Sequence, residues 1–247
     1  MEIRYGKQYS QALGREMEYK IYGHGGKPFL IIPCQAGRFY EFEDRKMTDY
    51  YAPYIESGKV QLFTIDTIDS ETLVASGDPR ARIELHERWI RYITEEAVPL
   101  FGKINGTGQR FGVEGLSLGA LHAATLTFRF PDLFDMLLGI SGLYSNEFYF
   151  GPYHDDLTYA NSPEQFLPNM PADHPYMEKY RRDKIILCVG QGAWEHVTAP
   201  STMKMGRIFR EKGIPAWVDV WGFDVKHDWD WWYRQTAYLL PSLFKDL

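Results

Sequence analysis

Residues 111–129 read Phe-Gly-Val-Glu-Gly-Leu-Ser-Leu-Gly-Ala-Leu-His-Ala-Ala-Thr-Leu-Thr-Phe-Arg. Residues 115–119 at its centre match the G-x-S-x-G pattern of a nucleophile elbow, in which a serine occupies a strained turn between a strand and a helix. Residues 110–114 predict the short strand, and the small and apolar side chains of 118–129 predict the helix. The flanking glycines would let neighbouring backbone approach without a Cβ clash. We therefore predict that Ser117 is a nucleophile, and the alternative is that it only caps the helix.

The composition indicates one α/β domain that binds a small molecule. The 247 residues are 45% hydrophobic and 16% aromatic, which suits a large core in a single domain over residues 1–247. The formal net charge of -6, without basic runs interleaved with aromatic residues, argues against a nucleic-acid partner. No apolar stretch is long enough to span a membrane, and the first residues lack the apolar region of a signal peptide. We expect a cytoplasmic protein whose Cys34 and Cys188 are reduced thiols.

Strand and helix signals alternate along the chain, which is typical of a mostly parallel sheet flanked by helices on both faces. Strands are predicted at 28–33, 60–65, 110–114, 136–141, 184–189 and 216–221, with a short edge strand at 18–22. Helices are predicted at about 44–57, 79–99, 118–129, 201–212 and 228–247. In the second of these helices His86 lies among charged residues, so we expect a solvated surface histidine, whereas His122 should be packed.

The segment 142–182 departs from this alternation. It gathers tyrosines and phenylalanines between residues 144 and 159, and four later prolines prevent a long helix. Long irregular segments of this kind are usually functional or mobile. We predict an insertion or lid over the carboxyl edge of the sheet, and an ordinary surface loop with packed aromatic residues is the alternative.

Two further residues could complete a catalytic triad with Ser117. Glu195 lies in the loop after the strand 184–189, and His227 lies in the loop after the strand 216–221. The order serine, acid, histidine is that of the α/β-hydrolases, and loops after parallel strands meet at one edge of the sheet. His227 would take the proton of the serine hydroxyl, and Glu195 would orient the imidazole ring and stabilise its charged form.

Other carboxylates compete for the role of the acid. Asp224 lies three residues before His227, but an aspartate there more readily organises its own turn. Asp66 and Asp69 precede the serine, which is out of order for this architecture, although either could contact substrate. The remaining histidines show no metal-ligand spacing, so neither a metal nor another cofactor is expected.

The chain resembles the esterase D and mycolyltransferase branch of the α/β-hydrolases. The resemblance rests on residues 115–120, Pro131-Asp-Leu-Phe134, Gly190-Gln-Gly-Ala-Trp-Glu195 and His227-Asp-Trp-Asp-Trp-Trp232. It implies the α/β-hydrolase fold, the triad Ser117, Glu195 and His227, and esterase or acyl-transfer activity. It also places an oxyanion hole at the amide of Leu118 and at the loop after the strand 28–33, where Gln35 or Ala36 would supply the second donor.

Three functions remain open from the sequence. The first is a serine esterase for a small-molecule ester, and the second transfers the acyl group to a sugar or alcohol. The third is a binding protein on a hydrolase scaffold, because a fold alone does not define a function. We expect Arg38, Tyr40 and Trp194 to contact substrate, since each lies in a loop that carries a predicted site residue.

Overall fold

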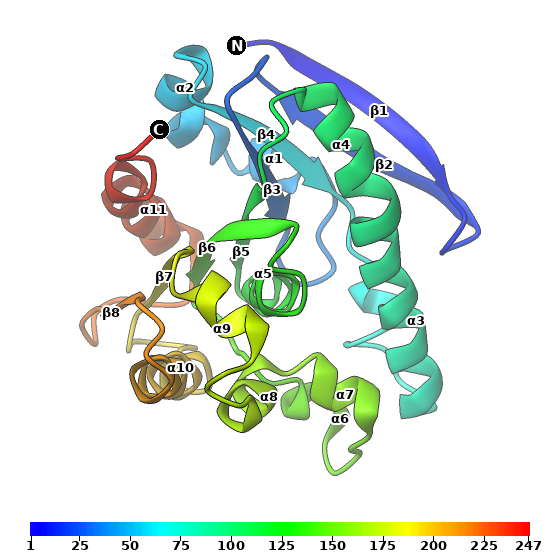
Figure 1. Cartoon of the computed structure of the whole chain (residues 1–247), viewed down its shortest axis with the longest axis vertical. Helices are drawn as coiled ribbons and strands as arrows, with labels where there is room; N and C mark the ends of the chain where they lie inside the picture. Colours follow the sequence, from blue (N-terminus) through cyan, green and yellow to red (C-terminus); the bar gives the residue numbers. More distant parts are fainter.

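The computed structural model describes residues 1–247 and contains one eight-stranded sheet with the strand order β1-β2-β4-β3-β5-β6-β7-β8. The strands β1 and β2 are antiparallel to their neighbours, and all the others pair in parallel. The predicted mostly parallel sheet is therefore confirmed (Figure 1). The strands are β1 Ile3–Ser10, β2 Arg15–Tyr22, β3 Lys27–Ile32, β4 Val60–Ile65, β5 Phe111–Leu116, β6 Phe134–Ile140, β7 Lys184–Val189 and β8 Trp217–Val220.

Helices cover both faces of the sheet. One apolar core joins the sheet to α3, α4, α5 and α10, and a second joins its other face to α2 and α11. Every residue of β3, β4 and β5 is buried, because these central strands are covered on both sides. The helices are α1 Glu41–Asp44, α2 Thr48–Glu56, α3 Pro79–Arg91, α4 Val98–Asn105, α5 Leu118–Arg129, α6 Glu147–Phe150, α7 Asp156–Ala160, α8 Pro163–Asn169, α9 Pro175–Tyr180, α10 Thr198–Lys212 and α11 Trp229–Leu243. None of them is both long and apolar enough to cross a membrane.

The edge of the sheet differs from the prediction. The segment predicted as an edge strand, 18–22, belongs to β2, which is interior because β1 pairs with it along its whole length. The sequence of β1 mixes charged, polar and aromatic residues, and most of its side chains are exposed. A strand outside the core therefore shows no apolar run or buried face from which it could have been predicted.

Two predicted helices are divided in the structure. The helix predicted at 44–57 is replaced by α1 and α2, because Lys46 between them has φ 56°, which is incompatible with a continuous helix. The helix predicted at 79–99 continues to Asn105 through a π-helical segment, Tyr92–Ala97. Pro99 does not end it: proline lacks the N–H of a regular α-helical hydrogen bond, and the π-helical segment, where the α-helical hydrogen-bonding pattern is interrupted, lies directly before it.

The prediction for His86 was wrong. Only 2% of its surface is exposed, and its ring packs on Trp89 and on the ring of His122, which is itself buried as predicted. The charged neighbours of His86 lie on the outer face of α3, whereas His86 shares the inner face with Ile83 and Trp89. Burial lowers the pKa of His86 well below its usual value, so it is neutral at pH 7.

The segment 142–182 forms four short helices, α6 to α9. Proline is in the first turn of both α8 and α9, where it is tolerated, so the prolines set the helix starts as well as preventing one long helix. Of these helices, α7 and α8 contact each other, α7 also contacts α3, and α8 also contacts α10 and α5 (Figure 1). Phe148 and Tyr149 of α6 lie near Ser117, which follows β5 at the carboxyl edge of the sheet.

Candidate active site

Ser117 lies in the turn between β5 and α5. Its backbone has φ 58° and ψ -124°, a conformation that costs a residue with a Cβ on the order of 1–3 kcal/mol. A Cβ at Gly115 would lie 2.0 Å from the backbone of Gly119, and a Cβ at Gly119 would lie 2.5 Å from the Pro33 carbonyl oxygen. Both glycines of the motif are thus needed for close backbone contact. The Ser117 hydroxyl makes no cap hydrogen bond, so this serine is not a helix cap.

The ring of His227 lies between Ser117 and Glu195. Its Nε2 atom is 2.9 Å from Ser117 Oγ, and its Nδ1 atom is 3.2 Å from Glu195 Oε2. The backbone N–H of His227 donates to the Ala193 carbonyl, which ties the histidine loop to the loop of the acid. The edge of the ring packs against Trp232 at the start of α11, with centroids 5.0 Å apart. The structure thus brings the three residues predicted from chain order into hydrogen-bonding distance.

Glu195 is almost fully buried, with 1% of its surface exposed. Ser141, at the end of β6, donates its hydroxyl to Oε1 at 2.5 Å, and Thr198, at the start of α10, donates its hydroxyl to Oε2. A buried carboxylate needs such donors, because its ionised form is otherwise strongly destabilised. When the His227 ring carries its proton on Nδ1, it donates a third hydrogen bond to the Glu195 carboxylate. Its Nε2 atom then has no proton and can accept a hydrogen bond from Ser117.

The competing carboxylates have other partners, and none bonds to His227. The Asp224 carboxylate folds back on its own turn, where a Cβ at Gly222 would lie 2.6 Å from Oδ1. Asp66 accepts hydrogen bonds from the Arg38 side chain and the Phe39 amide, both at 2.8 Å. Asp69 belongs to a different network, which reaches the loop after β3.

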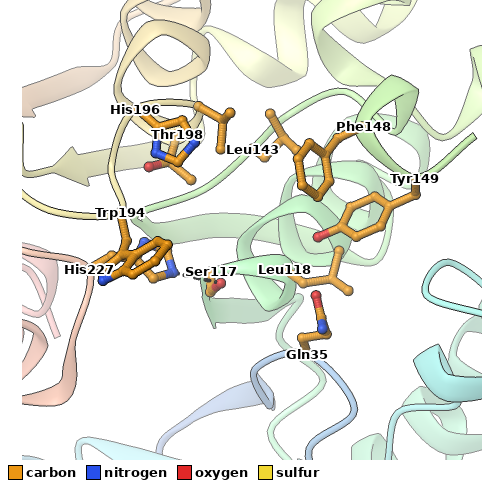
Figure 2. A pocket seen from close by; sticks show the side chains of 11 residues that line it. Gln35, Ser117, Leu118, Leu143, Phe148, Tyr149, Trp194, His196, Thr198 and His227 are labelled. Atoms are coloured by element: carbon orange, nitrogen blue, oxygen red, sulfur yellow. Dashed lines mark hydrogen bonds between the residues drawn. The ribbon is translucent and has the colours of Figure 1, made fainter. Parts of the chain in front are cut away.

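A cavity of about 330 Å³ opens above Ser117. Figure 2 shows Trp194 and His227 on one side of the serine, Phe148 and Tyr149 across from them, and Gln35 next to Leu118. Trp194 and Phe148 are 75% and 66% exposed, so the mouth of the cavity is open and aromatic. Leu143, Val197, His196 and Thr198 complete the lining.

Two backbone amides near Ser117 have no partner within the chain. Leu118 is the first residue of α5, and a helix provides no acceptor for the N–H groups of its first turn. In the loop after β3, Cys34 donates its N–H to Glu41 at 2.8 Å, and Ala36 donates its N–H to Asp69 at 3.0 Å. Between them, the Gln35 N–H makes no hydrogen bond, and Gln35 lines the cavity. Of the two predicted loop donors, only Gln35 therefore has a free amide.

Arg38 and Tyr40 do not line the cavity. The Arg38 guanidinium pairs with Asp66 and with Glu18, at 2.8 Å and 2.5 Å, and lies over the Tyr40 ring. Its charge is thus balanced by carboxylates of the protein itself. Trp194, the third residue predicted to contact substrate, is in the lining.

Sequence reasoning missed Ser141 and Thr198, both of which bond to Glu195. Their positions carried a weak signal, since Ser141 ends a parallel strand and Thr198 begins a helix three residues after the acid. Tyr149 and Phe148 belonged to the aromatic cluster of the predicted lid, but nothing in the sequence separated them from its packed members. No group of three or more His, Cys, Asp or Glu side chains is arranged to hold a metal ion.

The sheet topology and the serine turn define a protein of the α/β-hydrolase fold. A family model described as "Putative esterase" matches residues 10–239, and the chain belongs to this esterase family. The predicted resemblance is therefore confirmed, and the protein is an esterase. Among curated proteins, none matches the chain.

Solved structures extend the comparison over nearly the whole chain. A ferulic acid esterase superposes with a TM-score of 0.77 at 15% identity, covering 99% of this chain and 98% of its own. An S-formylglutathione hydrolase from Agrobacterium tumefaciens gives 0.76 at 14% identity, covering 99% and 95%. MPT51 (FbpC1) from Mycobacterium tuberculosis gives 0.65 at 12% identity, covering 97% and 98%. At such identities the similarity shows a shared fold.

Proposed function

We propose that the protein is a serine carboxylic-ester hydrolase that forms an acyl-enzyme on Ser117. The observation that carries this proposal is the line of contacts from Ser117 Oγ to His227 Nε2, at 2.9 Å, and from His227 Nδ1 to Glu195, at 3.2 Å. At these distances the imidazole can accept the serine proton while the carboxylate holds the ring in the required tautomer.

In the first half of the reaction, Ser117 Oγ attacks the ester carbonyl carbon while its proton passes to His227 Nε2. The carbonyl oxygen becomes an oxyanion, which accepts hydrogen bonds from the N–H groups of Leu118 and Gln35. Glu195 stabilises the imidazolium. The tetrahedral intermediate collapses, and the C–O bond to the alcohol breaks as the alcohol oxygen takes the proton from Nε2.

The second half repeats these steps with water. His227 Nε2 takes one proton of the water as its oxygen attacks the acyl carbon, and the same two amides stabilise the second oxyanion. The bond from Ser117 Oγ to the acyl carbon then breaks, and Oγ recovers the proton from Nε2. The products are a carboxylic acid and the alcohol, and the enzyme returns to its starting state.

The cavity supports a small-molecule ester with a short or aromatic acyl group as the substrate. Its volume of about 330 Å³ is small, and Leu143, Phe148 and Tyr149 form an apolar wall beside the serine. A ferulic acid esterase is among the similar structures, and its name implies an aromatic acyl group. Such a group would pack between the aromatic side chains of the wall.

The open mouth favours hydrolysis over acyl transfer. Phe148 and Trp194 line the cavity and are largely exposed, so the cavity is open to solvent beside them. Water therefore reaches the acyl-enzyme, whereas transfer to a sugar or alcohol requires that water be excluded. The aligned side chains of Ser117, His227 and Glu195 also argue against a protein that only binds its ligand.

The cysteines support a location in a reducing compartment such as the cytoplasm. Cys34 and Cys188 are both free thiols, and Cys188 is buried. Proteins of oxidising compartments more often use their cysteines in disulfides.

The proposal is tested with a fluorophosphonate probe and short p-nitrophenyl esters, with Ser117→Ala as the control. We expect covalent labelling at Ser117, a burst of p-nitrophenol, and neither in the control. Product analysis with added alcohols separates hydrolysis from transfer, since a transferase would form the new ester in preference to the free acid. A folded wild-type protein that is neither labelled nor active would refute the proposal.

A further inference from the structure

The amide proposed to bind the oxyanion lies between two amides that are each held by a carboxylate. Cys34 N–H donates to Glu41 at 2.8 Å, and Ala36 N–H donates to Asp69 at 3.0 Å, while the N–H of Gln35 between them is free. The two carboxylates come from different segments, Glu41 from α1 and Asp69 from the 3-10 turn after β4. The peptide groups on both sides of the Cys34–Gln35 peptide are therefore fixed.

The Cys34–Gln35 peptide is itself oriented by its carbonyl group. The oxygen of Cys34 accepts a hydrogen bond of 2.8 Å from the N–H of Gly37. Because a trans peptide is planar, with its C=O and N–H pointing in opposite directions, the Gln35 N–H is directed away from this turn. Gln35 lines the cavity beside Leu118 (Figure 2), so the side left for its N–H is the cavity side.

Asp69 joins this loop to the helix that carries the other proposed donor. Its Oδ2 atom accepts from Ala36, and its Oδ1 atom lies 2.9 Å from His122 Nε2, about one turn along α5 from Leu118. Asp69 is only 2% exposed. Burial raises its pKa, but the contacts with His122 and Ala36 outweigh burial and hold the pKa below its usual value, so Asp69 is an anion at neutral pH.

The conformation of the loop needs this support. Ala36 has φ 56°, the left-handed region that a residue with a Cβ adopts only at a cost. At Gly37 a Cβ would lie 2.8 Å from Glu41 Oε2 and 2.9 Å from the Cys34 carbonyl oxygen, so the carboxylate fills the space that a side chain would occupy. Without the two carboxylates, the strained turn could relax by rotating the peptide and turning the Gln35 N–H out of the cavity.

We propose that Glu41 and Asp69 are positioning residues that hold the Gln35 amide toward the oxyanion, with Asp69 also fixing this loop to α5 through His122. The inference rests on the proposed function. Neither carboxylate contacts the reacting atoms, and both act through the backbone of the loop. A donor of this kind contributes on the order of a hundredfold or more to kcat, because it stabilises charge that develops only in the transition state.

The test compares Asp69→Ala with Asp69→Asn and with the matched control Asp66→Ala. Asp66 accepts an amide hydrogen bond from Phe39 of the same loop, but that amide is four residues beyond Gln35. We expect Asp69→Ala to lower kcat about 10- to 100-fold with little change in KM. Asparagine keeps the size of the side chain and an oxygen that can accept from the Ala36 N–H, so Asp69→Asn should stay within about threefold of wild type, as should Asp66→Ala.

An aryl trifluoromethyl ketone supplies a readout that loop stability alone would not change. Ser117 Oγ adds to its carbonyl carbon, the proton passes to His227, and the resulting hemiketal oxyanion occupies the oxyanion hole. The inhibition constant should rise in Asp69→Ala by the same factor by which kcat/KM falls. The pKa of the hemiketal hydroxyl, followed by ¹⁹F NMR, should rise as well. Both quantities should be unchanged in Asp66→Ala.

If Asp69→Ala does not fold, Glu41→Ala is the second variant. It should show the same fall in kcat and the same weaker binding of the ketone. An unchanged kcat in the folded alanine variant, an effect on KM alone, or an equal loss in Asp66→Ala would overturn the inference. A fall in kcat without weaker ketone binding would overturn it too. These results differ from a failure of the proposed function, which would show as a wild-type enzyme without activity or labelling at Ser117.

Discussion

Replacing Glu195 by glutamine perturbs a carboxylate that is surrounded by donors. Ser141 donates to Oε1 at 2.5 Å, while Thr198 and the Nδ1 atom of His227 approach Oε2, the latter at 3.2 Å. Glutamine keeps the size of the side chain but exchanges one acceptor oxygen for an NH₂ donor. The variant can place this donor in two ways, and they bracket the size of the effect.

With the amide nitrogen toward His227, two donors face each other, so the ring must move its proton to Nε2 and can no longer accept from Ser117. A wrong tautomer of this kind lowers kcat on the order of 10⁴-fold. With the amide nitrogen toward Ser141, the tautomer survives and only the negative charge opposite the imidazolium is lost. We take on the order of 10²-fold for that case, so the loss of transition-state stabilisation lies between about 3 and 5 kcal/mol.

The assay measures kcat, KM and the melting temperature of Glu195→Gln on one short p-nitrophenyl ester. We expect kcat to fall by 10² to 10⁴ with a nearly constant KM, since the acid acts on the base and does not bind substrate. Asp224→Asn is the control, because Asp224 is exposed and folds back on its own turn. A Glu195→Gln enzyme within fivefold of wild-type kcat, with the loss appearing in Asp224→Asn, would refute the assignment.

Three further substitutions test other parts of the molecule. Trp232→Phe removes the indole N–H that donates to Ser141 Oγ at 3.0 Å, so kcat should fall about 2- to 12-fold at constant KM, and an unchanged kcat would show that this bond does not act on the acid. Burial and the nearby Glu41 carboxylate raise the pKa of the Cys34 thiol well above its usual value, so Cys34→Ser should keep kcat within about threefold, and an inactive variant would contradict this. Burial raises the pKa of Glu114 from 4.5 to about 8, so between these pH values the folded protein holds a proton that the unfolded chain has released. The free energy of unfolding should therefore fall as the pH rises from 4.5 to 8, by up to about 1.4 kcal/mol per pH unit. Urea unfolding at pH 5 and pH 8 should show a smaller difference for Glu114→Gln, and an equal difference would refute the role of Glu114.

The interior of the sheet could be predicted because burial leaves a pattern in the sequence. The bounds predicted for β4, α5 and β7 match the structure, since each is an apolar segment closed by glycine, proline or charged residues. β1 could not be predicted, because it lies outside the core and its side chains obey no burial constraint. His86 was predicted wrongly because its neighbours in the sequence are charged. Those neighbours lie on the outer face of α3, whereas His86 lies on its buried face.

The side chains of the site could be predicted further than its backbone. The prediction that Ser117, Glu195 and His227 lie together depended on their residue types, their order and the strands before them, all of which restrict the possibilities. Almost any residue can supply a backbone N–H, so the sequence could not show whether Gln35 or Ala36 is the donor. The distinction depends on Asp69, which follows the loop by more than thirty residues and meets it only in the folded chain.

The burial of Glu195 explains how the fold holds the proposed catalytic side chains in place. Its hydrogen-bond donors come from separate elements: Ser141 directly follows β6, Thr198 begins α10, and Trp232 of α11 donates to Ser141 in turn. Each of these elements packs into one of the two apolar cores. Displacing the Glu195 side chain would therefore mean leaving a buried carboxyl group without hydrogen-bond partners or moving a core element, and both are costly.

The side chains at the mouth of the cavity are not held in place by buried hydrogen bonds. Trp194 and Phe148 are largely exposed, and neither side chain makes a hydrogen bond that the site depends on. Substitutions there change the shape offered to a substrate at little cost in stability, because exposed side chains contribute little to the free energy of folding. A ferulic acid esterase and an S-formylglutathione hydrolase share the fold of this chain at 15% and 11% identity, although their names refer to different substrates. We therefore expect substitutions in the exposed loops above the cavity to change which ester is accepted, and to leave the contacts among Ser117, His227 and Glu195 intact.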